Sequence, residues 1–257
     1  MFPDAPSIHP YLENPGTGPT STFCAELARR LECYVTAGFP ERLEHSDSQP
    51  LLTTSATIHP SLPAPVGANT AVLYGPTGKL LSLYRKSNLF RTDLSWATAG
   101  HGFTVIDLPL PLGKTSIAIC NDLNPQAPAV WDSLENGPYE LAKYCMREGT
   151  RLLVLLNAWL SDADENKESG DEGSDEEGSE DQMTIDTDDD LHQEPDWSVL
   201  RWWSARLRPT WARDRRDEQT RHPRTDCIEH NDLAVVLCNR SGRERGVVSI
   251  PGPCCVC

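Results

Sequence analysis

The sequence predicts a single α/β domain, and three observations support this fold class. The 257 residues are 38% hydrophobic and include seven tryptophans, which is enough for a sizeable core. Residues 114–120 and 151–158 form apolar runs typical of strands, and residues 138–148 between them repeat apolar side chains at helical spacing. A strand, a helix and a second strand in this order favour helices layered on a sheet.

The beginning of the chain is expected to hold one helix and the first strand. Residues 1–20 are rich in proline and glycine and show no period, so we expect coil until a Thr-Ser pair at 20–21 caps a helix. Apolar side chains then recur at helical spacing as far as residue 32. A strand is expected at residues 33–37, closed by the Gly-Phe-Pro sequence at 38–40.

A hairpin and two further strands are expected next. Residues 70–74 and 79–85 alternate as strands around Gly-Pro-Thr-Gly at 75–78, which is strong turn chemistry. Residues 103–108 then resemble a strand, joined to the strand at 114–120 by a proline-rich link. The sheet is therefore expected to gain most of its strands before residue 120.

A strongly acidic stretch accounts for almost all of the net charge of −15. Residues 161–190 hold fifteen Asp or Glu and one Lys, so this stretch carries −14 and leaves the rest nearly neutral. It has no aromatic residue and cannot bury enough surface to offset the entropy of ordering. We expect a disordered acidic insertion at 161–192, and we do not take the charge as evidence of a cationic substrate.

The chain after this insertion is expected to return to the fold. Residues 197–216 are rich in Trp and Arg and favour a helix, and strands are expected at 233–239 and 246–250. The arginines and tryptophans could also bind nucleic acid by phosphate contact and stacking. Because Asp214, Asp217 and Glu218 dilute that basic stretch, we expect no nucleic-acid partner.

The sequence predicts a soluble cytoplasmic protein, with the nucleus as a second location. No basic segment followed by an apolar one comes after Met1, and the longest apolar run, at 152–156, is far below the roughly 18 residues needed to span a bilayer. The nine cysteines form an odd set without CxxC pairs and are expected to be reduced thiols. Cys227 and His230 match no common zinc framework, so neither a metal nor a cofactor is expected.

Cys120 is the most informative residue, because it ends a strand and opens directly onto the polar sequence Asn-Asp-Leu-Asn-Pro. A thiol at a strand end can be reached by substrate, and a catalytic role would imply a depressed thiol pKa. A buried residue that only fills the core is an equally good interpretation by position alone. Lys86 stands at the end of the second hairpin strand, where a lysine is ordinarily a solvated charge.

Taken together, YRKSNLF at 84–90 and AICNDLNP at 118–125 resemble the nitrilase, or carbon–nitrogen hydrolase, superfamily. Its members use a Cys, Lys and Glu triad on an α-β-β-α sandwich. Further matches at PYLE (10–13), GFPE (38–41), NAWL (157–160) and CNRSG (238–242) are similar to the protein N-terminal amidases of that superfamily. The resemblance implies one carbon–nitrogen hydrolase domain over residues 1–257, with the nitrilase-type sandwich truncated at both ends.

This resemblance implies hydrolysis of the side-chain amide of N-terminal Asn or Gln of proteins or peptides, a step of N-degron processing that releases ammonia. Cys120 would be the nucleophile that forms a thioester, and Lys86 with the backbone N–H of Asn121 would bind the oxyanion. We expect Lys86 and Cys120 to be brought together by adjacent strands. Asp122 would bind the free α-ammonium of the substrate or, equally, cap the turn after Cys120. The alternatives are a small-molecule amidase and a non-catalytic protein that binds N-termini or a partner.

The sequence departs from the resembling enzymes at two carboxylates. Their general-base Glu lies upstream of the position matched by Phe2, and Asp4 and Glu13 are poor substitutes for it. A second carboxylate, expected shortly before Gly100, reads Ala99. We therefore expect the two carboxylates around the thiol to be absent and the activity to be weak or lost.

Overall fold

The computed structural model describes residues 2–43, 65–159, 196–212 and 233–240, together with the backbone of residues 242–244, 247–249 and 255–256. The insertion expected at 161–192 lies outside the described residues, as do Cys227 and His230. In the described part of the chain, no helix is long and apolar enough to cross a membrane.

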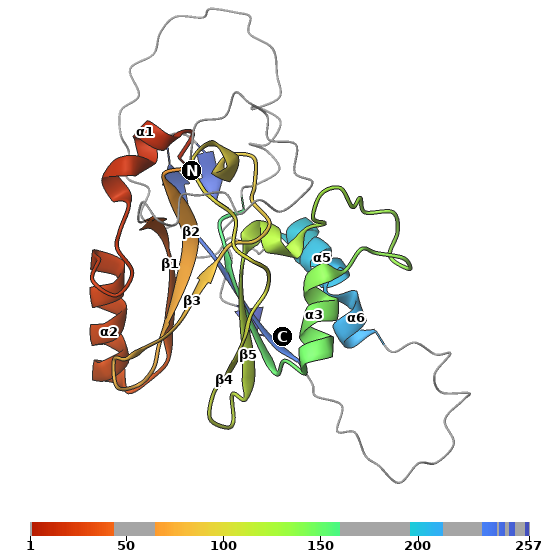
Figure 1. The fold of residues 1–257 in the computed structure, drawn as a ribbon. Coiled ribbons are helices and arrows are strands. Elements are labelled where there is room, and N and C mark those ends of the chain that lie inside the picture. Colours follow the sequence, from red (N-terminus) through yellow and green to blue (C-terminus); the bar gives the residue numbers. More distant parts are fainter. Residues whose placement is uncertain are drawn as a thin grey trace, which may run out of the picture.

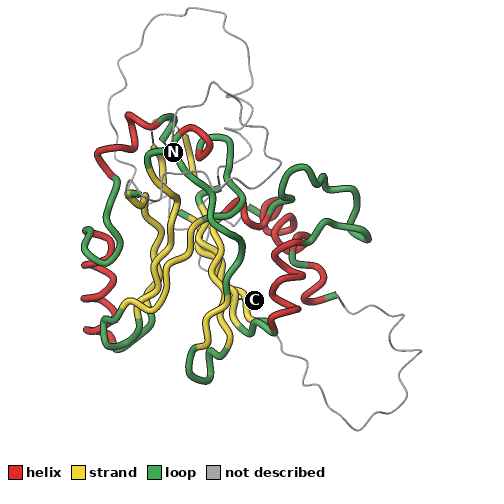
Figure 2. Tube along the Cα trace, viewed as in Figure 1, coloured by secondary structure: helices red, strands yellow, loops and turns green. Residues whose placement is uncertain are grey.

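Two sheets face each other and are covered on their outer sides by helices, so the predicted α-β-β-α layering is confirmed (Figures 1 and 2). The first sheet is antiparallel with the order β1-β2-β3, formed by β1 (Val35–Arg42), β2 (Gly67–Tyr74) and β3 (Leu80–Arg85). The second sheet has the order β10-β7-β6-β5-β4, formed by β4 (Val105–Asp107), β5 (Lys114–Ile119), β6 (Leu152–Asn157), β7 (Ala234–Asn239) and β10 (Cys255–Val256). A separate hairpin pairs β8 (Gly242–Glu244) with β9 (Val247–Ser249).

The helices divide between the two outer layers. Helix α2 (Pro19–Leu31) covers the first sheet, and short segments α1 (Ala5–Ile8) and η1 (His9–Tyr11) precede it (Figure 1). Helices α3 (Glu140–Glu148), α5 (Trp197–Arg206) and α6 (Arg208–Trp211) lie on the other side of the molecule, beside the second sheet (Figure 1). Two short 3-10 helices lie in the loops, η2 (Asp93–Ser95) and η3 (Cys120–Leu123).

The parallel strands β5, β6 and β7 explain why residues 114–120 and 151–158 read as apolar runs. Their side chains alternate between two cores, because successive residues of a strand point to opposite faces. Ile117 and Ile119 pack between the sheets with Leu73 and Tyr84 of the first sheet. The residues that point the other way form the core with α3 and α5, and include Ala118, Leu141, Leu153, Leu155, Trp203 and Leu237.

The N-terminal region differs from the prediction in several details. The expected coil contains α1 and η1, and α2 begins at Pro19 with Gly18 at its N-cap, not Thr20 or Ser21, because proline at the first helical position needs no N–H partner. Strand β1 continues through Pro40 to Arg42, because the proline lies on an edge strand and its carbonyl accepts a hydrogen bond from the N–H of Glu13 at 2.8 Å. Helix α2 buries its small residues Cys24 and Ala28, whereas Phe23 is 64% exposed. Helical spacing identified the helix correctly but not the face that it buries.

Candidate active site

The nucleophile candidate lies on a tight turn at the end of β5. Cys120 begins the 3-10 helix η3 and has a φ of 47°; with Glu32 it is one of two non-glycine residues with positive φ in the described chain. This left-handed conformation costs about 1 kcal/mol or more and persists only where the surroundings hold it. The side chain is partly buried, and the backbone N–H of Ala158 at the end of β6 donates a hydrogen bond to it.

The protonation of Cys120 differs from the expectation for a catalytic thiol. Burial raises the pKa of the Cys120 thiol above its ordinary value, while the Lys86 ammonium and the Ala158 N–H act to lower it. Asp93 and Asp122 are close enough to raise the pKa further. The direction of this shift is opposite to the depression that a catalytic role would imply.

Lys86 is a buried charge, not a solvated one. Its side chain is 3% exposed, and its Nζ donates to Asp93 Oδ2 at 2.6 Å. A buried ammonium is tolerated only with a close partner, which explains the short ion pair. Asp93 is held in turn by the N–H of Phe90, which donates to Oδ2 at 2.9 Å, and by the side chain of Asn69 at 3.4 Å.

The expectation that two carboxylates around the thiol would be missing overlooked Asp93. Its carboxylate contacts Lys86 directly and acts on the Cys120 pKa. The sequence did offer a signal, because Asp93 follows Lys86 by seven residues in one loop, where two side chains can meet. Asp4 and Glu13 have other tasks: the Asp4 carboxylate caps α1 at Ser7, and Glu13 accepts two hydrogen bonds from Thr20 at the start of α2.

Lys86 and Cys120 come from facing sheets, because β3 lies in the first sheet and β5 in the second. The expectation that adjacent strands bring them together is therefore wrong. The core that contains Ile119 and Tyr84 joins the two sheets, and the Lys86 ammonium is close enough to act on the Cys120 pKa. The candidate site thus lies where β3 of one sheet and β5 of the other end.

Asp122 joins the loop after β3 to the turn after β5. It is fully buried, and its Oδ1 accepts from the N–H groups of Ser87 at 3.0 Å and Asn88 at 2.8 Å. Its Oδ2 accepts from the N–H of Ile119 and the hydroxyl of Tyr84, both at 2.8 Å. Four donors occupy the two oxygens, so the structure supports the turn-cap role and leaves no exposed carboxylate oxygen for a substrate ammonium.

Asn121 occupies the second position of η3, where a backbone N–H has no acceptor within the helix itself. The side chain of Asn88 holds this turn from outside, because its Nδ2 donates to the carbonyls of Asn121 at 2.7 Å and Asn124 at 3.1 Å. Sequence reasoning assigned no role to Asn88. The bond is invisible in a local pattern, since more than thirty positions separate the partners.

The arginines considered for nucleic acid are only partly described, and Arg206 is not available to phosphate. It is 2% exposed and donates to backbone carbonyls in the loop after Cys120. This burial removes a central residue from the suggested basic surface.

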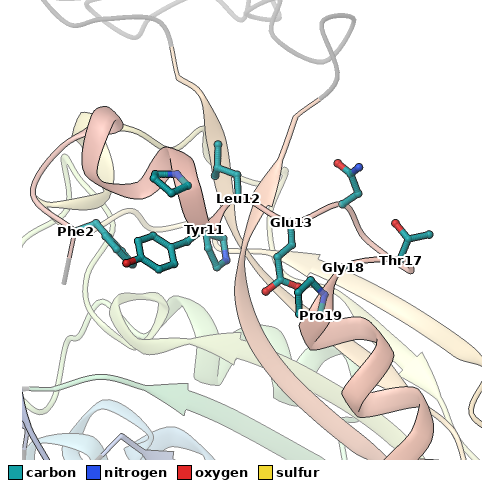
Figure 3. A pocket seen from close by; sticks show the side chains of 10 residues that line it. Phe2, Tyr11, Leu12, Glu13, Thr17, Gly18 and Pro19 are labelled. Carbon is teal, nitrogen blue, oxygen red and sulfur yellow. The ribbon is translucent and has the colours of Figure 1, made fainter.

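A cavity of about 550 Å³ lies away from this site, between η1 and the start of α2 (Figure 3). Phe2, Tyr11, Glu13 and Gly18 line part of it. None of Cys120, Lys86 and Asp93 contributes to its lining. We therefore do not treat it as part of the candidate active site.

Comparison with known proteins places these residues in context. A family model described as carbon–nitrogen hydrolase matches residues 4–133. The protein N-terminal amidase of Schizosaccharomyces pombe is 28% identical over 271 residues, covering 99% of this chain and 73% of its own length. That of Saccharomyces cerevisiae is 23% identical over 174 residues, covering 60% of this chain and 32% of its own length.

Solved structures show the same fold. A crystal structure of an N-terminal amidase with an Asn-Glu-Ala peptide has a TM-score of 0.65 and 18% identity, and covers 97% of this chain and 76% of that one. Another with a Gln-Gly peptide has a TM-score of 0.60 at 18% identity, covering 97% and 75%. The predicted sandwich type is therefore confirmed.

Proposed function

Because this chain belongs to the carbon–nitrogen hydrolase family, we propose that it removes ammonia from the side-chain amide of N-terminal Asn or Gln in proteins and peptides. The observation that carries the proposal is the buried Lys86–Asp93 pair next to a thiol on a strained strand-end turn. Similarity to the S. pombe protein N-terminal amidase over 99% of the chain supports the choice of substrate.

In the proposed reaction, the Cys120 sulfur gives up its proton and attacks the amide carbon, and the carbonyl oxygen becomes an oxyanion. The Lys86 ammonium and the Asn121 N–H stabilise this charge. The C–N bond then breaks, the nitrogen takes up the proton that the thiol lost and leaves as ammonia, and a thioester remains on Cys120. Water hydrolyses the thioester, which gives the carboxylic acid and restores the thiol.

Within this scheme Asp93 keeps the Lys86 ammonium in place. A lysine side chain has four rotatable bonds, and without a fixed partner its charge would not point at one position. The 2.6 Å contact supplies that partner inside the protein, where the charge is most effective. We assign the described residues only nucleophilic, oxyanion-binding and positioning roles.

Ammonia release from matched substrates tests the proposal. Peptides that begin with Asn or Gln should be hydrolysed, whereas the same peptides with an acetylated N-terminus and free glutamine should not. Hydrolysis of free glutamine in preference to the peptides would favour a small-molecule amidase. Binding of the peptides without ammonia release would favour the non-catalytic alternative.

A further inference from the structure

The turn that carries Cys120 is tied to a helix that comes about eighty residues later in the chain. Trp202 of α5 donates its indole N–H to Asn124 Oδ1 at 2.9 Å. The amide of Asn124 then donates to Asn121 Oδ1, also at 2.9 Å. Two consecutive hydrogen bonds therefore connect α5 to the residue whose backbone N–H is assigned to the oxyanion.

Arg206, one helical turn further along α5, makes a second connection. Its Nε donates to the carbonyl of Leu123 at 2.8 Å, and its terminal nitrogens donate to the carbonyl of Pro138 and to Glu140 at 3.2 Å. The guanidinium also lies 4.5 Å from the centre of the Trp131 ring. A buried arginine with all of these partners holds the end of η3 in one place.

The turn is thus held from two directions. Asp122 and Asn88 fasten it to the loop after β3, and Trp202 and Arg206 fasten it to α5. A positive φ at Cys120 requires surroundings that leave the turn no alternative conformation. We propose that Trp202 and Arg206 are positioning residues that keep the Asn121 N–H aimed at the developing oxyanion, an assignment that rests on the proposed function.

Trp202 allows the hydrogen bond to be separated from packing. Its ring packs against Trp131 at 5.4 Å, so a phenylalanine keeps one aromatic ring there while it removes the N–H donor and the second ring of the indole. Trp197 lies on the same helix and is 57% exposed, so Trp197→Phe is a matched control. Asn124→Ala removes the next member of the connection.

The test compares kcat, KM and melting temperature for these variants with an Asn-initiated peptide. Trp202→Phe should lower kcat about tenfold. This is less than the loss of an oxyanion donor, because the backbone N–H of Asn121 is displaced and not deleted. KM and the melting temperature should stay close to wild type, since the lost contact acts in the transition state. Trp197→Phe should be unchanged, and Trp202→Phe should have little further effect on Asn124→Ala.

A kcat for Trp202→Phe equal to that of wild type would overturn the proposal, as would a change in KM alone or independent effects of Trp202→Phe and Asn124→Ala. Alkylation of Cys120 by iodoacetamide gives a readout that needs no turnover. A loosened turn should alkylate severalfold faster in Trp202→Phe than in wild type or Trp197→Phe. If wild type releases no ammonia, the proposed function fails and the assignment to the oxyanion fails with it. Faster alkylation of Trp202→Phe would then support only the holding of the turn by Trp202, and unchanged alkylation would reject that as well.

Discussion

Replacing Asp93 by asparagine should damage both stability and catalysis, because it removes one charge of the buried pair and leaves the other. Lys86 is 3% exposed and its Nζ lies 2.6 Å from the carboxylate, so neutral asparagine leaves an ammonium with little solvent to replace its partner. Breaking such a pair typically lowers the free energy of unfolding by about 3–5 kcal/mol. For a domain of this size, that corresponds to a fall in melting temperature of about 10 °C.

The same change should lower kcat about 100-fold, the scale for loss of one fixed oxyanion-binding group. The assays are thermal unfolding and ammonia release at a temperature where the variant remains folded. Glu41→Gln is the control for loss of a buried carboxylate, because Glu41 is 3% exposed and pairs at 2.7 Å with Arg85, the residue before Lys86. It should retain kcat and lose less stability than Asp93→Asn, since the Arg85 side chain is 29% exposed and solvent can replace its partner. An Asp93→Asn variant with wild-type kcat and a loss below about 1 kcal/mol would refute the reasoning.

Three further predictions follow from the charges and hydrogen bonds around Cys120. The rate of its alkylation should rise with pH through a midpoint above the ordinary thiol pKa of about 8.5, because burial raises the pKa; a midpoint below this value would contradict the account. Lys86→Met should move that midpoint higher, since the ammonium lowers the pKa of Cys120, and Asp93→Asn should move it lower; shifts in the opposite directions would reject these charge assignments. Asp122→Asn should reduce stability and slow hydrolysis, because an amide cannot accept from all four donors. Weaker discrimination between free and acetylated N-termini, with chemistry intact, would instead give Asp122 the ammonium-binding role.

Much of the architecture could be predicted from local patterns. The apolar runs that became β5 and β6, the hairpin of β2 and β3, and the position of Cys120 at a strand end all follow from composition and turn residues within short windows. These signals depend on neighbours in sequence, and the structure confirms them.

What the local patterns could not supply is the pairing of distant segments. Cys120 and Lys86 meet across facing sheets, and Asp122 and Arg206 are fixed by partners more than thirty positions away. Arg206 lies in a segment of charged and aromatic residues whose composition is typical of an exposed surface. In the structure its side chain is 2% exposed, and it donates a hydrogen bond to the carbonyl of Leu123 in η3. Charged residues become informative about a site only when their partners are known.

The most direct test of the central claim is ammonia release from an Asn-initiated peptide by wild type, Cys120→Ser and Cys33→Ser measured side by side. Cys33 is also a partly buried free thiol, so its replacement controls for the loss of a cysteine as such. The account predicts ammonia from wild type and Cys33→Ser, and none above background from Cys120→Ser. Equal release by Cys120→Ser and wild type would show that the sulfur at residue 120 is not the nucleophile.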